Sequence, residues 1–303
     1  MKKLDDFLRP TQKQLFKLLA KKFKGKAILS KGNFILVRGT APVMLVAHLD
    51  TVHTEPVKQI CASKGGNILM SPQGIGGDDR CGVFAIVKIY LSAQVKPWLL
   101  FTCDEEVGGL GAQHFCQLYS QGLLPKELDA LKFLVEIDRK GKNDAVYYDC
   151  DNPDFEEYIT GKGFKTAIGS FSGISLIAPE LGIAAVNLSS GYYNAHTLHE
   201  FINVKELHDT IHRVGEIVGE AVALPRFEYF EAMAILPELP SQQIINRVEN
   251  ESLAYSVPTS LRDLYAVLLD FYSPVELNSF RREFGDKVLW QLYEEEIAPF
   301  YQR

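Results

Sequence analysis

The stretch Pro42-Val43-Met44-Leu45-Val46-Ala47-His48-Leu49-Asp50-Thr51 decides the fold that we expect for this chain. Its apolar run is typical of a buried strand in a parallel sheet, and the run stops on a His and an Asp two positions apart. In sheets of this kind, ligand sites form beyond the carboxyl ends of the strands. We therefore expect His48 and Asp50 to lie at one rim of a sheet, where a metal site would begin.

Other apolar runs repeat this arrangement. Further strands are predicted over 26–30, 33–38, 98–103, 132–138, 145–149 and 183–188, and helices over 4–23, 82–91, 112–119, 153–160, 174–180 and 204–223. Three of the strands end close to residues that can bind a metal ion, namely Glu105 and Glu106, Asp138, and His196 and His199. Strands that alternate with helices predict an α/β fold, with a mostly parallel mixed sheet sandwiched by helices.

The pattern of predicted elements changes beyond Pro225. Strand alternation stops, and prolines punctuate helix-like runs over 260–271, 274–284 and 287–293. We therefore expect an α/β domain over residues 1–225 and a small helical C-terminal extension over 226–303, whose role the sequence does not indicate.

Composition excludes several classes of partner. The net charge is −6, from 32 Lys and Arg against 38 Asp and Glu, and no long basic run is present, so we expect no nucleic acid partner. No apolar stretch approaches the roughly 20 residues that cross a bilayer, so we expect no membrane association. The five cysteines are odd in number and form no C-x-x-C pair, which argues against disulfides and thiolate zinc sites. We expect a cytoplasmic protein.

The residues at the strand ends indicate metal chemistry. Imidazole and carboxylate ligands without thiolate suit zinc or a similar first-row divalent ion. Asp78 and Asp79 add two more carboxylates, where a glycine-rich loop enters the predicted helix over 82–91. This set is too large for one tetrahedral site, so we predict two metal ions that share a bridging carboxylate. Two divalent cations about 3.5–4 Å apart activate water and polarise a carbonyl group, which is the chemistry of amide hydrolysis.

Four stretches of the chain resemble, in the same order, the motifs of the di-zinc exopeptidases related to peptidase T. They are His-Leu-Asp-Thr-Val at 48–52, Gly-Asp-Asp-Arg-Cys-Gly at 77–82, Asp-Glu-Glu-Val-Gly at 104–108 and Tyr-Asn-Ala-His-Thr-Leu-His-Glu-Phe at 193–201. The resemblance implies that His48, Asp78 and Asp138 bind one zinc ion, and that Asp78, Glu106 and His196 bind the other. Residues 1–225 would thus be a zinc exopeptidase-like catalytic domain.

The resemblance also implies roles for residues around the metal ligands. Asp50 would orient His48, and Glu105 would be the general base. The Asp78–Asp79 peptide bond would be cis. His199 is the alternative last ligand, but the family's final histidine is followed four residues later by Glu, which selects His196 with Glu200. We interpret the remaining histidines as surface or packing residues; they are His53, His114, His208 and His212.

The chain departs from the family in two respects. The interval between Asp138 and His196 is too short for the lid and dimerisation domain that peptidase T carries there. The segment 169–173, Gly-Ser-Phe-Ser-Gly, corresponds to the family's Gly-Gly-Thr-Asp-Gly and lacks its acidic residue. We therefore expect a catalytic domain without a lid, in which recognition of the substrate's end differs.

These observations lead to a functional hypothesis with two alternatives. We expect a di-zinc exopeptidase, either an aminopeptidase or a small-peptide hydrolase, because Asp rather than Glu at position 138 resembles the aminopeptidase branches. The alternatives are an amidohydrolase or carboxypeptidase that removes an acyl group or a C-terminal residue, and a non-catalytic metal-binding domain in an assembly. The substrate would be a peptide or an acyl-amino acid, Co²⁺ or Mn²⁺ could replace Zn²⁺, and the sequence is compatible with an oligomer.

Overall fold

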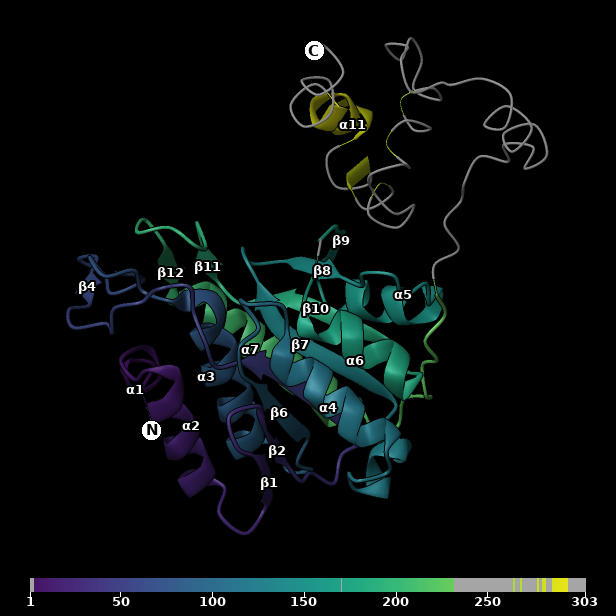
Figure 1. Cartoon of the computed structure of the whole chain (residues 1–303). Helices are drawn as coiled ribbons and strands as arrows, with labels where there is room; N and C mark the ends of the chain where they lie inside the picture. Colours follow the sequence, from purple (N-terminus) through teal and green to yellow (C-terminus); the bar gives the residue numbers. More distant parts are fainter. Residues whose placement is uncertain are drawn as a thin grey trace. The chain divides into compact units, whose positions relative to one another are not determined.

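The chain divides into two compact units. The computed structural model describes residues 3–169, 171–231, 264, 268, 277, 280, 281 and 285–293. The first unit comprises Met1–Ala167 and Phe171–Glu231, and the second comprises Ile168–Ser170 and Ala232–Arg303. Figure 1 shows the α/β sheet of the first unit with helices on both of its faces.

The first unit is built on an eight-stranded sheet in the order β1-β2-β6-β3-β7-β10-β8-β9. The strands are β1 (Ala27–Ser30), β2 (Phe34–Val37), β3 (Val43–His48), β6 (Trp98–Thr102), β7 (Phe133–Arg139), β8 (Asp144–Val146), β9 (Lys165–Ala167) and β10 (Ala185–Ser189). The neighbours β6, β3, β7 and β10 run parallel, whereas β2 on one side and β8 on the other are antiparallel to them. The predicted fold class is therefore confirmed, and the carboxyl ends of four central strands meet at one edge.

Helices cover both faces of the sheet and explain why β3 is apolar throughout. The side chains of Leu45 and Ala47 pack with α1 (Asp5–Leu8), α2 (Gln12–Lys22), α3 (Gly77–Ser92), α5 (Pro153–Gly161) and α7 (Val204–Glu220). Those of Met44 and Val46 point to the other face and pack with α4 (Leu110–Ser120), the 3-10 helix η1 (Lys126–Ala130) and α6 (Gly173–Leu181). A strand that is buried on both faces loses the polar alternation of a half-exposed strand.

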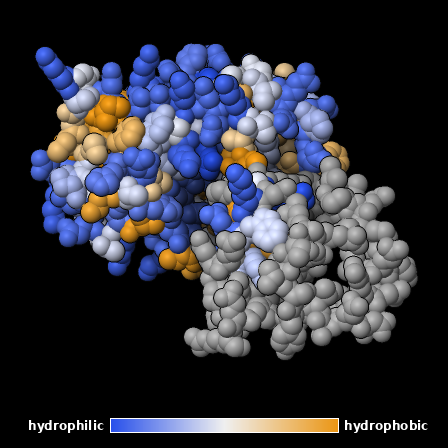
Figure 2. Space-filling view, turned by 90° about the horizontal axis from the view of Figure 1, so that it is seen from above, coloured by the Kyte–Doolittle hydropathy of each residue, from blue (hydrophilic) through white to orange (hydrophobic). Residues whose placement is uncertain are grey.

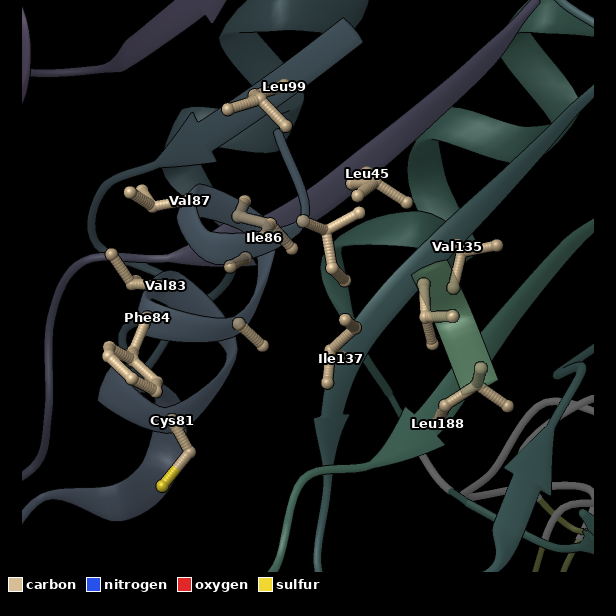
Figure 3. Packing of buried hydrophobic residues seen from close by; sticks show 14 of the residues in the cluster. Leu45, Cys81, Val83, Phe84, Ile86, Val87, Leu99, Val135, Ile137 and Leu188 are labelled. Carbon is tan, nitrogen blue, oxygen red and sulfur yellow. The ribbon is translucent and has the colours of Figure 1, made fainter. Parts of the chain in front are cut away.

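The layer between α3 and the sheet is close-packed. Figure 3 shows Ile86 and Val87 of α3 in the same cluster as Leu45, Leu99 and Val135 from three neighbouring strands. Burying side chains of this size stabilises the fold by about 1.5–3 kcal/mol each. This packing holds the first turn of α3, which carries Asp78, against the sheet edge.

A second, four-stranded sheet was not predicted from the sequence. Its order is β11-β12-β5-β4, with β4 (Cys61–Ala62), β5 (Ile68–Met70), β11 (Tyr192–Tyr193) and β12 (Phe201–Asn203). Strands of two or three residues are too short to display a period, so the sequence shows them as connections. The sheet matters for the site because the loop between β11 and β12 carries His196.

The second unit contains a small apolar cluster of its own. It includes α11 (Asp286–Leu292), and its buried side chains are Leu264, Leu268, Leu277, Leu289 and Tyr293. The helix predicted over 287–293 agrees with α11, whereas those over 260–271 and 274–284 lie largely outside the described residues. The division expected between residues 225 and 226 stays a prediction; residues 226–231 lie in the first unit, and Phe227 is part of its core. Within the described part of the chain, no helix has the length and apolar character needed to span a bilayer.

Candidate metal centre

His48 and two carboxylates meet at the carboxyl edge of the central strands. His48 is the last residue of β3 and is 1% exposed. Its Nε2 atom lies 3.2 Å from Asp78 Oδ1 and 3.7 Å from Asp138 Oδ2, which comes from the end of the neighbouring strand β7. These three residues are the predicted ligands of one metal ion, and the structure places both carboxylates beside the imidazole of His48.

A second group forms on the other side of Asp78. His196 Nε2 lies 3.3 Å from Asp78 Oδ2 and 3.1 Å from Glu106 Oε2. Asp78 thus has one carboxylate oxygen beside His48 and the other beside His196, as a bridging ligand would. Among the described residues, two groups of donor atoms lie within 4.8 Å of one another, His48 with Asp78 and Glu106, and His48 with Asp79 and Asp138. Neither group includes His196 or His199, and His199 is exposed.

Asp78 and Asp79 differ in what their carboxylates contact. The peptide bond between them is cis, in agreement with the sequence resemblance. Asp79 accepts hydrogen bonds from the backbone N–H groups of Gly82, at 2.9 Å, and His48, at 3.2 Å. Its carboxylate is therefore engaged by the backbone around the site, whereas that of Asp78 faces the two histidines.

Asp50 and Glu105 flank the cluster. Asp50 Oδ1 lies 3.3 Å from Nδ1 of His48, and Asp50 Oδ2 accepts a 3.0 Å hydrogen bond from the backbone N–H of Glu106. Burial by itself raises the pKa of Asp50, but the hydrogen bond and charge attraction of His48 outweigh it and lower this pKa to about 2. Glu105 Oε2 lies 3.8 Å from His48 Nε2, and burial raises the pKa of this carboxyl group.

The cluster holds more buried negative charge than its histidines balance. Burial and the neighbouring Asp78 raise the pKa of Glu106 to about 7, and the same two causes raise the pKa of Asp138 well above its usual value. The Oε1 atom of Glu106 is buried without a hydrogen-bond partner. Carboxylate and imidazole donors that converge with an unpaired buried oxygen fit divalent cations, whose charge would offset this repulsion.

The sequence did not reveal two further buried carboxylates. Glu136 lies on β7 two positions before Asp138, and the Ser172 hydroxyl donates a hydrogen bond to it. Burial, followed by the charge of Glu105, raises the pKa of Glu136 to about 8. Ser172 belongs to the segment that lacks the family's acidic residue. A Glu inside an otherwise apolar strand is the signal that could have identified this position.

Glu200 is the other buried carboxylate. Its partners are the backbone at the start of α3 and His53 Nε2, which lies 3.0 Å from Glu200 Oε2. His53, which the sequence suggested as a surface or packing residue, is thus engaged by the carboxylate that follows His196. In the sequence, Glu200 indicates only that His196 rather than His199 is the last histidine of the motif.

A cavity adjoins the cluster. It measures about 530 Å³, and its wall includes Asp50, Glu106, His53, Arg80 and Asp104. Arg80 is buried and donates to the backbone oxygens of Phe7 and Pro10, at 2.9 and 2.7 Å. Viewed from above, the surface of the first unit is mostly hydrophilic with scattered hydrophobic residues (Figure 2). A cavity with partly apolar walls and a few polar groups, beside such a cluster, is a suitable place for a small substrate.

Comparison with known proteins gives the fold a context. No protein-family model matches the chain, and no curated protein matches it in sequence. Among solved structures, a tripeptidase from Staphylococcus aureus has a TM-score of 0.55 at 15% identity, covering 73% of this chain and 96% of that one. Aminopeptidase PepT from Bacillus cereus has a TM-score of 0.53 at 15% identity, covering 72% of this chain and 98% of that one.

A TET aminopeptidase from a marine sediment archaeon of the Thaumarchaeota gives a similar result. Its TM-score is 0.54 at 12% identity, and the match covers 72% of this chain and 94% of that one. The chain therefore has the fold that these tripeptidases and aminopeptidases share.

Proposed function

We propose that this protein is a metal-dependent exopeptidase that hydrolyses a peptide bond at one end of a short peptide. The observation that carries the proposal is the position of Asp78, with one oxygen 3.2 Å from His48 Nε2 and the other 3.3 Å from His196 Nε2. Glu105 lies beside His48, with its Oε2 atom 3.8 Å from His48 Nε2. The fold shared with a tripeptidase and with aminopeptidases supports a peptide as the substrate.

The proposed ligands divide into two sets that share Asp78. His48 and Asp138 would complete one set, and Glu106 and His196 the other. Two divalent cations held there would make water a stronger nucleophile at neutral pH and would polarise the scissile carbonyl group. We infer Zn²⁺ from the donor types, with Co²⁺ or Mn²⁺ as substitutes.

The remaining residues of the cluster have roles of their own. Glu105 takes the proton of the attacking water and delivers it to the leaving amine. Burial raises the pKa of Glu105, in the direction that favours a group which must both accept and donate a proton. Asp50 holds the imidazole of His48 in the orientation that presents Nε2 to the cluster. The adjoining cavity would receive the terminal residue of the peptide.

Two structural facts support the accompanying expectations. The interval between Asp138 and His196 is occupied by α5, α6 and strands of the two sheets, which supports a domain that works without an inserted lid. All five cysteines are free, which supports a cytoplasmic location.

The test is metal content and hydrolysis in the wild-type chain and in Glu105→Gln. We expect both proteins to bind two zinc ions, and hydrolysis by the variant to fall by about 10²–10⁴-fold, the usual contribution of a general base. Glu216→Gln, on the exposed side of α7, is the matched control and should retain full activity.

Substrates with a free and with an acylated amino terminus separate the alternatives. An aminopeptidase cleaves aminoacyl reporters, whereas an amidohydrolase or carboxypeptidase prefers acylated dipeptides. A wild-type chain that binds zinc tightly and cleaves no peptide of either kind would refute the proposal in favour of a metal-binding domain without turnover.

A further inference from the structure

Glu200 is fully buried at the end of the loop that carries His196. Its Oε1 accepts a 2.9 Å hydrogen bond from the backbone N–H of Asp78, and its Oε2 accepts one of 2.9 Å from the backbone N–H of Gly76. His53 Nε2 lies 3.0 Å from Oε2. A buried carboxylate is stable only when donors surround it, and here three donors do.

The backbone donors are Gly76, which immediately precedes α3, and Asp78 in its first turn, where N–H groups lack intrahelical partners. The approach is close because the residue between them, Gly77, has no side chain. A Cβ atom at Gly77 would lie 3.2 Å from Glu200 Oε1 and 2.8 Å from the Cβ atom of Tyr192. The carboxylate thus ties the loop between β11 and β12 directly to the residue that would bridge the two metal ions.

The ligands of the two proposed metal sites are held in place by different contacts. His48 and Asp138 lie in central strands whose neighbours hold them on both sides. The side chain of His196 is 56% exposed, and its residue has a φ of 65°, in a loop whose hydrogen bonds join Asn194 to Thr197 and to His199. Those bonds shape the loop internally, whereas the bonds of Glu200 set its position relative to Asp78.

We propose that Glu200 is a positioning residue for the second metal site, formed by Asp78, Glu106 and His196. It fixes the His196 loop against the start of α3, so that Nε2 of His196 lies within 3.3 Å of the Asp78 carboxylate. This inference rests on the proposed function, because it assumes that these side chains bind a metal ion. The first site shares Asp78 with the second, but its other two ligands, His48 and Asp138, lie in the central strands and make no hydrogen bond with Glu200.

The test is zinc binding to the metal-free full chain, measured by titration calorimetry, in the wild type, Glu200→Gln and Glu200→Asp. The amide of Gln has only one oxygen. If its N–H₂ group takes the place of Oε2, it faces the donors of Gly76 and His53, and if it takes the place of Oε1, the N–H of Asp78 loses its acceptor. The side chain of Asp is too short to reach both backbone N–H groups. We expect one ion to bind both variants as it binds the wild type, and the second ion to bind about 10–100-fold more weakly. Glu206→Gln is the matched control, since Glu206 accepts from the Tyr193 hydroxyl at 2.6 Å, and it should bind both ions normally.

Thermal unfolding in a chelator shows whether each variant is folded, and Glu200→Asp provides the measurement if Glu200→Gln is not. The inference would be overturned if the variants bound each of the two ions with the wild-type affinity, within about threefold. It would also be overturned if Glu200→Gln alone weakened binding of the second ion, because the charge of Glu200 rather than its position would then be the cause. A wild type that binds two ions but hydrolyses no peptide would refute the proposed function and leave this inference standing. A wild type without a second binding event would refute both.

Discussion

Asn187 should be essential for the stability of the sheet edge that carries Asp138. β10 pairs with β7 through Asn187 and Glu136, and the register then shifts before Ser189 pairs with Arg139. At this break the side chain of Asn187 replaces a backbone partner. Its Oδ1 accepts from the N–H of Asp138 at 2.8 Å, and its Nδ2 donates to the carbonyl oxygen of Asp138 at 3.1 Å.

The substitution Asn187→Leu keeps the volume of the side chain and removes both polar atoms. Asn187 is 1% exposed, so water does not replace the lost amide, and the backbone N–H of Asp138 is left unpaired, whereas its carbonyl oxygen still accepts a hydrogen bond from the Tyr192 hydroxyl at 3.1 Å. Each unpaired buried group costs about 1–3 kcal/mol. With one such group, we expect the free energy of unfolding of the first unit to fall by about 1–3 kcal/mol.

Urea unfolding of the metal-free full chain, followed by circular dichroism, measures this loss. Asn152→Ala is the comparison, because Asn152 caps α5 by accepting from the backbone N–H of Phe155 at 3.0 Å, and loss of such a cap costs about 1 kcal/mol. A loss below about 1 kcal/mol for Asn187→Leu would show that the amide does not substitute for the missing ladder bonds.

Two further predictions follow from packing and burial. A Cβ atom at Gly82 would lie 2.1 Å from the backbone oxygen of Ile137, so Gly82→Ala should push α3 away from β7 and destabilise the chain by about 3 kcal/mol or more. A Cβ atom at Gly215 in α7 would have no atom within 4 Å, so Gly215→Ala should stabilise the chain by about 0.5–1 kcal/mol. Thermal unfolding compares the two variants, and equal effects on stability would contradict the argument. Cys61 is exposed, while burial raises the pKa of Cys103 and Cys116 to about 12, which leaves little thiolate at pH 8. A thiol reagent should therefore label Cys61 first in the native chain, as mass spectrometry would show; rapid labelling of Cys103 would contradict the burial described.

The parts of the fold that could be predicted are those whose signal is local. The strand at 42–47 is recognisable because both of its faces are buried, and α7 because its apolar positions recur with helical spacing. The helix α3 is recognisable as a continuous apolar run that follows a glycine-rich loop. The sheet of β4, β5, β11 and β12 has strands too short for any period, and the pairing of β5 with β12 joins residues more than a hundred positions apart. The stability of such strand pairs comes from tertiary contacts, so no local sequence pattern predicts them.

The candidate site divides in the same way. The sequence by itself determined which residue types stand at the strand ends, because a charged residue after a buried strand is visible in the pattern. Residue type alone did not distinguish Asp78 from Asp79, and only the resemblance to the exopeptidases selected Asp78. In the structure the backbone groups of His48 and Gly82 engage Asp79 and leave Asp78 for the histidines. Likewise, the contact of Glu200 with the start of α3 places His196, and not His199, beside Asp78.

The chemistry of the metal centre is thus encoded in the sequence, whereas its geometry is a product of the tertiary structure. Residue types and periodicity are properties of a segment, so the sequence alone indicates carboxylates and histidines at one edge of an α/β sheet. The direction of each side chain depends on hydrogen bonds from distant segments, such as those of Asn187 to Asp138 and of Glu200 to Asp78. These bonds exist only after the strands and the loops have been brought together.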